Sequence, residues 1–193
     1  MKIYFYILIF LLPISTSSSI RAVLPAPDKL GAVIDTASSY VGVKEKTGSN
    51  DGKEVEMFLN SVGLKKGNPW CQAFIYYCFK ANYKKPPIPR SAMAQSSFNY
   101  ALKHGIKTPL VLKPGDLIIW KKASSWSGHV GLIDSVGKGG WVQTIEGNTS
   151  NGKTGSQREG NGVFKRLRNY FHPLSRYVFT RGFVGFYRKI EDV

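Results

Sequence analysis

The spacing of apolar residues divides the chain into a first part typical of helices and a second part typical of strands. In the first part, apolar side chains recur every three or four positions, which is the period of an amphipathic helix. Asp28 can serve as the N-cap of the first such segment. Glycines or the proline-rich stretch "KKPPIPR" follow the later segments and end them. We therefore predict four helices, over residues 28–40, 54–62, 70–81 and 91–103.

The second part consists of short runs rich in β-branched and aromatic residues, separated by glycine-rich breaks. Runs of this kind are typical of strands. Five of them are present: "GDLIIW", "HVGLIDSV", "WVQTIEG", "GVFKRLRNY" and "GFVGFYRKI". Because the helices come first and the strands second, the order predicts an α+β fold rather than a βαβ alternation. We expect one domain with about five strands.

The first 22 residues have the composition of a secretory signal peptide. The positive start "MK" precedes a charge-free apolar run at 3–14, and small polar residues follow. The run is shorter than the roughly 20 apolar residues that span a bilayer. We predict a signal peptide at 1–22, a linker at 23–29 and one folded domain at 30–193. The protein would then be secreted or periplasmic, with no stable membrane span; an uncleaved N-terminal anchor is the alternative.

The chain is strongly basic, with 27 Lys and Arg against 12 Asp and Glu and a formal net charge of +15. The signal segment contributes little to this excess, because it contains only Lys2 and Arg21 and no acid. An exported protein of this charge is attracted to polyanions. Outside the cell the candidates are anionic envelope polymers, peptidoglycan included, and membrane surfaces, so we expect such a partner and no nucleic acid. The alternative is an ordinary solvated surface.

The two cysteines lie on the third predicted helix, Cys71 at its start and Cys78 seven residues later. On a helix they would be about 10 Å apart along the axis. A disulfide needs Cα atoms within about 7 Å, so we predict two free thiols. Cys78 falls among apolar residues and is expected to be an inert packed thiol. Cys71 lies where free N–H groups and the helix dipole favour a thiolate and can hold an oxyanion, although a structural role would fit it equally well.

A thiolate nucleophile needs a base within hydrogen-bond reach, and His129 is the best of three histidines. His129 opens an apolar strand after a glycine, whereas His104 ends a predicted helix and His172 precedes a proline. A hairpin through "GKGG" would place residue 129 opposite roughly residue 147. Glu146 and Asn148 would then return to the height of the imidazole, on one face of the sheet. A carboxylate there could orient the imidazole.

The stretches "NPWCQAF", "GHVGLI" and "IEGN", in this order and spacing, resemble the CHAP-type cysteine, histidine-dependent amidohydrolase/peptidase family. That family is part of the wider NlpC/P60, papain-like superfamily, and the resemblance covers roughly residues 33–187. It implies a papain-like α+β fold in which a helix carrying the nucleophile packs on an antiparallel sheet carrying the base. Residues 30–193 would accordingly form a CHAP-like catalytic domain that cleaves amide bonds in peptidoglycan.

Carried over position by position, the resemblance makes Cys71 the nucleophile, His129 the general base, Glu146 the orienting acid and Asn148 an auxiliary polar group. The sequence departs from many relatives in having Gln72 and Ala73 after the cysteine, which leaves open which neighbour helps to bind the oxyanion.

The remaining expectations concern the substrate groove and the cofactors. Trp70, Gln72 and Trp126 are candidates for substrate or oxyanion contacts, and Trp120 and Trp141 are expected in the core. Some relatives bind calcium, but "TGSNDGK" offers one acid, Asp51, so we expect no metal and no other cofactor.

The leading hypothesis is therefore a secreted bacterial peptidoglycan hydrolase, acting as a monomer through a Cys-His-Glu thiol mechanism. It would be either an N-acetylmuramoyl-L-alanine amidase or an endopeptidase of the peptide stem or cross-bridge. A cysteine protease or acyltransferase on the same scaffold is a second hypothesis, because fold and triad do not fix the acyl acceptor. A non-catalytic, basic wall-binding or toxin-like protein is the third.

Overall fold

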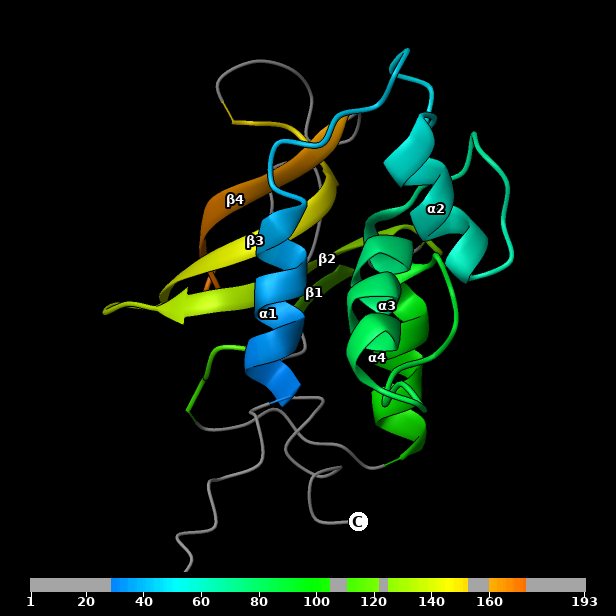
Figure 1. The fold of residues 1–193 in the computed structure, drawn as a ribbon. Helices are drawn as coiled ribbons and strands as arrows, with labels where there is room; N and C mark the ends of the chain where they lie inside the picture. The colour runs from blue at the N-terminus through cyan, green and yellow to red at the C-terminus, as the bar shows by residue number, and fades with distance from the viewer. Residues whose placement is uncertain (1–28, 105–110, 122–124, 153–159, 173–193) are drawn as a thin grey trace, which may run out of the picture.

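The computed structural model describes residues 29–104, 111–121, 125–152 and 160–172, and in this part the helices precede the strands, as expected for an α+β fold (Figure 1). The four helices are α1 (Lys29–Ser39), α2 (Lys53–Ser61), α3 (Cys71–Asn82) and α4 (Ala94–Lys103). The strands are β1 (Leu117–Lys121), β2 (Gly128–Val136), β3 (Trp141–Thr149) and β4 (Gly162–Asn169).

Each described element lies within a few residues of its predicted position. The sheet of the described residues has four strands against the five expected. The fifth predicted strand, at 182–190, lies outside the described residues. So do the predicted signal peptide, the linker and the cap Asp28, except for Lys29, which begins α1.

The sheet is an antiparallel meander in the order β1-β2-β3-β4. Trp120 of β1 pairs with His129 of β2, and Leu132 pairs with Ile145 of β3. Continued toward the start of β2, the second register sets residue 148 opposite His129, within one residue of the prediction. The pairing of β3 with β4 shifts between Glu146 and Thr149, which marks a bulge at the end of β3 that carries the candidate residues.

The main core lies between the helices and one face of the sheet, and α3 is its central element. Eight of the twelve residues of α3 are buried, because the helix packs on α1, α2 and the sheet at once (Figure 1). Strand β1 is apolar on both faces and buried on both. Leu117 and Ile119 contribute to the main core, whereas Ile118 and Trp120 join a second cluster. The continuous apolar run "LIIW" thus reflects a strand buried on two sides.

The start of α3 is held close to the end of β3. A Cβ at Gly147 would lie 2.7 Å from the ring of Trp70 and 2.8 Å from Cβ of Phe74, closer than packed atoms approach. Only glycine allows this contact. The first turn of α3, which carries Cys71, is therefore fixed beside the strand end that carries Glu146.

Candidate active site

Cys71 is the first residue of α3, and its thiol interacts with the imidazole of His129, whose pKa it raises. The N-cap residue, Trp70, makes no side-chain hydrogen bond to the first turn. The first N–H groups of a helix have no partner within the helix, so the backbone at Cys71 offers donors beside the sulfur. The residue is 5% exposed, a small opening to solvent.

His129 links Cys71 to Glu146. Its Nε2 lies 2.9 Å from Oε2 of Glu146, which leaves Nδ1 as the ring nitrogen for the sulfur. Burial alone would lower the pKa of His129, but the interactions of its ring with Cys71 and with the carboxylate of Glu146 outweigh burial and raise the pKa to about 9. The indole of Trp120 is stacked against the ring, with centroids 5.8 Å apart. The imidazole is thus fixed in orientation and favoured as a cation.

Glu146 is wholly buried and accepts hydrogen bonds from three side chains. Besides His129, the hydroxyl of Thr144 donates to Oε1 at 2.6 Å. Arg168 donates from Nε to Oε1 at 2.7 Å and from Nη2 to Oε2 at 2.5 Å. Burial would raise the pKa of Glu146, but Arg168 and then His129 lower it far below its usual range. A Cβ at Gly131 would come within 3.0 Å of Cγ of Glu146, so the strand beside the carboxylate also needs a glycine.

A thiol, an imidazole and a carboxylate joined in this order at a helix N-terminus form the arrangement that cysteine hydrolases use. The comparison with protein families points the same way: residues 63–148 match the CHAP domain model. This stretch of the chain is similar to CHAP domains. The match includes Cys71, His129 and Glu146. No curated protein matches the chain.

Asn148, the last residue of the CHAP match, has a different position from the one that strict strand alternation predicts. Its φ is 53°, and it lies in the bulge of β3. With its amide oxygen toward Trp70 and its nitrogen toward Gly160, the side chain accepts from the backbone N–H of Trp70 at 3.2 Å and donates to the carbonyl of Gly160 at 2.6 Å. Asn148 therefore ties the strand to the residue before Cys71.

Of the three residues predicted to contact the substrate or the oxyanion, two have wholly buried side chains. Trp70 is wholly buried, stacked on Phe58, and its Nε1 donates to Glu45 at 2.8 Å. The large ring fills the core under α3 instead of lining a groove. Gln72 is also wholly buried, because α3 is covered on nearly all sides. What Gln72 can still offer an oxyanion is its backbone N–H.

Trp126, the third predicted contact, is 68% exposed. It lies in the segment before β2, which α4 holds in place: Nε2 of Gln95 donates to the carbonyls of Ser125 at 2.6 Å and Ser127 at 2.8 Å. The indole is therefore displayed three residues before His129 on a fixed backbone. That position suits a contact with a substrate that approaches the imidazole.

Of the predictions for the other tryptophans and for the thiols, all but the one for Trp141 agree with the structure. Trp120 is buried as expected, but Trp141 is 47% exposed, because it begins β3 at the tip of the β2–β3 hairpin. Cys71 and Cys78 are both free thiols, as predicted. Burial raises the pKa of the Cys78 thiol well above its ordinary value, which keeps that thiol protonated and unreactive.

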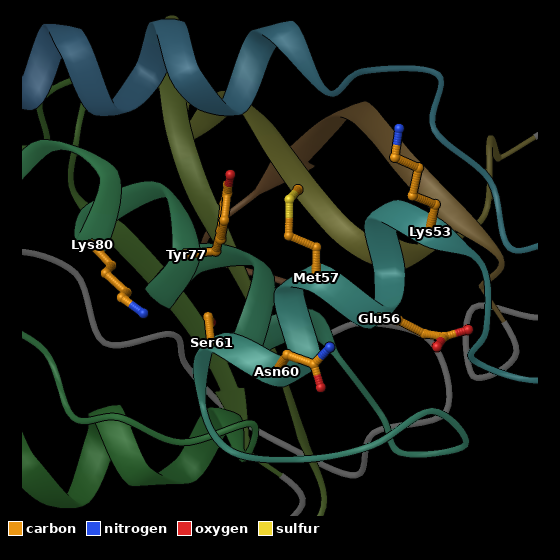
Figure 2. Close-up of a pocket in the computed structure, with 7 residues that line it drawn as sticks. All are labelled: Lys53, Glu56, Met57, Asn60, Ser61, Tyr77 and Lys80. Atoms are coloured by element: carbon orange, nitrogen blue, oxygen red, sulfur yellow. The ribbon is translucent and has the colours of Figure 1, made fainter.

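An open depression of about 580 Å³ lies between α2 and α3, away from the candidate triad. Figure 2 shows it with Lys53 and Lys80 at opposite ends of the group of lining residues.

Asp51, the acid considered for calcium, accepts hydrogen bonds from the backbone N–H and the hydroxyl of Thr47. Among the described residues, no group of three or more His, Cys, Asp or Glu side chains could hold a metal, and no helix is long and apolar enough to cross a membrane.

Sequence reasoning missed Arg168 and Thr144. Arg168 lies on β4 opposite Val142, outside the CHAP match, and Thr144 lies two residues before Glu146. The signal for Thr144 was the two-residue spacing, which puts it on the same face as Glu146. For Arg168 the signal was a charged residue at a strand position that pairs with a buried valine, and it becomes visible only once the β3–β4 register is known.

Proposed function

We propose that this protein is a secreted cysteine hydrolase that cleaves an amide bond of peptidoglycan, with Cys71 as nucleophile, His129 as general base and Glu146 as orienting carboxylate. The CHAP domain itself indicates a peptidoglycan hydrolase of the amidase or peptidase type. The observation that carries the cysteine mechanism is the position of the His129 imidazole, which interacts with the thiol of Cys71 and has its Nε2 2.9 Å from Oε2 of the buried Glu146.

In the first half of the reaction, the proton of the Cys71 thiol passes to His129, which gives a thiolate and an imidazolium. The sulfur attacks the carbonyl carbon of the amide, a C–S bond forms, and the carbonyl oxygen takes up the negative charge. Backbone N–H groups of Cys71 and Gln72, at the start of α3, stabilise that oxyanion. The imidazolium then donates its proton to the leaving nitrogen as the C–N bond breaks, and a thioester is left on Cys71.

In the second half, a water molecule takes the place of the released amine. His129 accepts a proton from the water, the oxygen attacks the thioester, and the C–S bond breaks to release a carboxylic acid. The proton on His129 restores the starting ion pair with the thiolate. The raised pKa of His129, about 9, supports this cycle because it favours the imidazolium beside the thiolate at neutral pH.

The scissile bond in this proposal is either the link between the glycan and the peptide or a bond within the peptide stem or cross-bridge. After cleavage of residues 1–22, 25 basic residues remain against 12 acidic ones, and this net charge of +13 supports attraction to an anionic cell wall. Secretion through cleavage of residues 1–22 belongs to the same proposal. N-terminal sequencing of the protein recovered from outside the cytoplasm tests it, and an intact Met1 there would contradict it.

Mass spectrometry of fragments released from defined muropeptides tests the function. The wild-type protein should produce one new amine and one new carboxylic acid, and the identity of the amine names the bond. Cys71→Ala should release neither, whereas His104→Ala, a change in an exposed histidine at the end of α4, should act like the wild type. Unchanged fragment release by Cys71→Ala would refute the thiol mechanism. Transfer of the acyl group to an added amine in place of water would indicate an acyltransferase.

A further inference from the structure

Arg168 is a buried charge with a specific partner, although it lies 20 residues beyond the end of the CHAP match. Its guanidinium forms a two-point contact with Glu146, with Nε on one carboxylate oxygen and Nη2 on the other. A planar guanidinium matches a carboxylate in this way, and a lysine ammonium cannot. The pair fixes the plane of the carboxylate as well as its charge.

The need for Arg168 follows from what His129 does during the proposed reaction. Glu146 has no contact with solvent, so its negative charge requires a nearby positive charge. His129 supplies one only while it is protonated, and in each cycle the imidazole gives its proton to the leaving nitrogen. An arginine stays charged throughout, because a guanidinium is not deprotonated in proteins. During the step in which His129 is neutral, Arg168 is the partner that keeps its charge.

Trp120 couples the two donors of the carboxylate. Its ring on β1 is stacked against the imidazole of His129 on β2, and the guanidinium carbon of Arg168 on β4 lies 5.5 Å from the centroid of the same ring. Arginine over an indole is a favourable cation–π geometry. One buried indole therefore orients both the imidazole and the guanidinium toward Glu146.

We propose that Arg168 is a positioning residue of the active site, which keeps Glu146 ionised and its carboxylate aligned on the imidazole of His129 throughout the catalytic cycle. This inference rests on the proposed function, because it assigns a role in that same reaction. It extends the working unit from three residues to four and places one of them outside the family match.

The charged groups around Glu146 come from three elements. The sulfur of Cys71 on α3 and the imidazole of His129 on β2 lie on one side, and Arg168 and Arg166 of β4 lie on the other. Arg166 interacts with the carboxylate through its charge alone: burial and then Arg168 lower the pKa of Arg166, and the negative charge of Glu146 raises it. The direct hydrogen bonds to Glu146 from β4 come from Arg168. Its removal should therefore let burial raise the pKa of Glu146.

The test is the pH profile of activity in substituted proteins. In Arg168→Met the carboxylate should be protonated at a higher pH, so the acid limb of kcat/KM should move up by about one to three pH units. Activity at pH 7 should fall by roughly 10- to 100-fold. Arg168→Lys keeps the charge and loses the two-point contact, so it should keep the acid limb near its wild-type position while kcat falls about tenfold.

The matched control is Lys165→Met, which removes the same unit charge from the same strand. Lys165 pairs with Asp134 at 2.7 Å and lies away from the carboxylate network, so its replacement should leave both the limb and kcat unchanged. A folded Arg168→Met protein with a wild-type acid limb overturns the proposal. If Arg168→Met does not fold, Arg168→Lys decides: a lowered kcat supports the proposal, and a wild-type kcat overturns it.

A second measurement separates this inference from the proposed function. Alkylation of Cys71 by iodoacetamide, followed against pH by peptide mass spectrometry, reports the thiolate–imidazolium pair without any wall substrate. In Arg168→Met the alkylation rate should begin to fall at a higher pH than in the wild type. If the wild type releases no muropeptide fragments while this shift is seen, the proposed function fails and the role of Arg168 stands. If fragments are released and the alkylation profiles of wild type and Arg168→Met coincide, the proposed function stands and the role of Arg168 fails.

Discussion

Replacing Glu146 by glutamine keeps the shape of a wholly buried side chain and removes its charge. The carboxylate oxygens accept four hydrogen bonds, two from Arg168 and one each from His129 and Thr144. An amide has one oxygen, and its NH₂ group is itself a donor. Whichever way the amide turns, its nitrogen faces at least one N–H of the guanidinium, so a buried donor loses its acceptor.

The size of the effect follows from this geometry. Each buried donor without a partner costs about 1–3 kcal/mol. Breaking a buried ion pair by removing one partner costs about 3–5 kcal/mol, and the orphaned guanidinium makes Glu146→Gln such a case. We expect the free energy of unfolding at pH 7 to fall by about 3–5 kcal/mol. Because folding lowers the pKa of Glu146, its stabilisation is present above the unfolded-state pKa of about 4.3 and is lost as pH falls below that value.

Urea denaturation followed by tryptophan fluorescence measures the difference at pH 7 and again at pH 3. The gap between wild type and Glu146→Gln should be large at pH 7 and should shrink at pH 3, where the carboxylate is protonated in the unfolded chain but still ionised in the folded protein. Glu56→Gln is the control, because that partly buried carboxylate of α2 accepts a single hydrogen bond, from the N–H of Gly52. A Glu146→Gln protein as stable at pH 7 as this control, or a gap that does not change with pH, would refute the reasoning.

Three further predictions concern the thiols, the imidazole and the exposed indole. Cys71→Ala should lower fragment release from muropeptides by at least about 10³-fold, while Cys78→Ala should keep the rate and lose about 1–2 kcal/mol of stability in urea. The pKa of His129, about 9 in the fold against 6.5 ordinarily, gives stability that is fully present below about pH 6.5 and lost as pH rises through 9. The urea midpoint should therefore fall between pH 7 and pH 10, and fall less in His129→Gln. Trp126→Ala should raise KM for muropeptides several-fold with little change in kcat; an unchanged KM would exclude the substrate contact.

Helices, strands and the central pair of the site could be predicted from the sequence because they depend on local patterns. Apolar periodicity located the four helices of the described residues, and the glycine-rich turn of a single hairpin brought Glu146 back to His129 within one residue of its register. A hairpin with a short turn fixes its own register, so a strand start and a strand end could be matched without knowing the rest of the fold.

The contribution of Arg168 could not be predicted in the same way, because β3 and β4 are joined by a long polar segment whose length does not fix their pairing. Trp70 was misjudged for a related reason. Its place beside the nucleophile suggested a groove, but its ring turns into the core against Phe58 and hydrogen-bonds Glu45 from the distant loop before α2. The position of Asn148 was also not predicted, because the bulge in β3 interrupts the strict alternation of side chains on which the prediction relied.

The central claim is that the sulfur of Cys71 attacks the amide with His129 as its base, and trapping the acyl-enzyme tests it most directly. Acid quenching during turnover of a muropeptide, followed by peptide mass spectrometry, should reveal the acyl part of the substrate attached to the peptide at Cys71. The adduct should be absent at Cys78 and should not form in His129→Ala. Turnover at the wild-type rate by Cys71→Ala, with no adduct on any cysteine, would contradict the account.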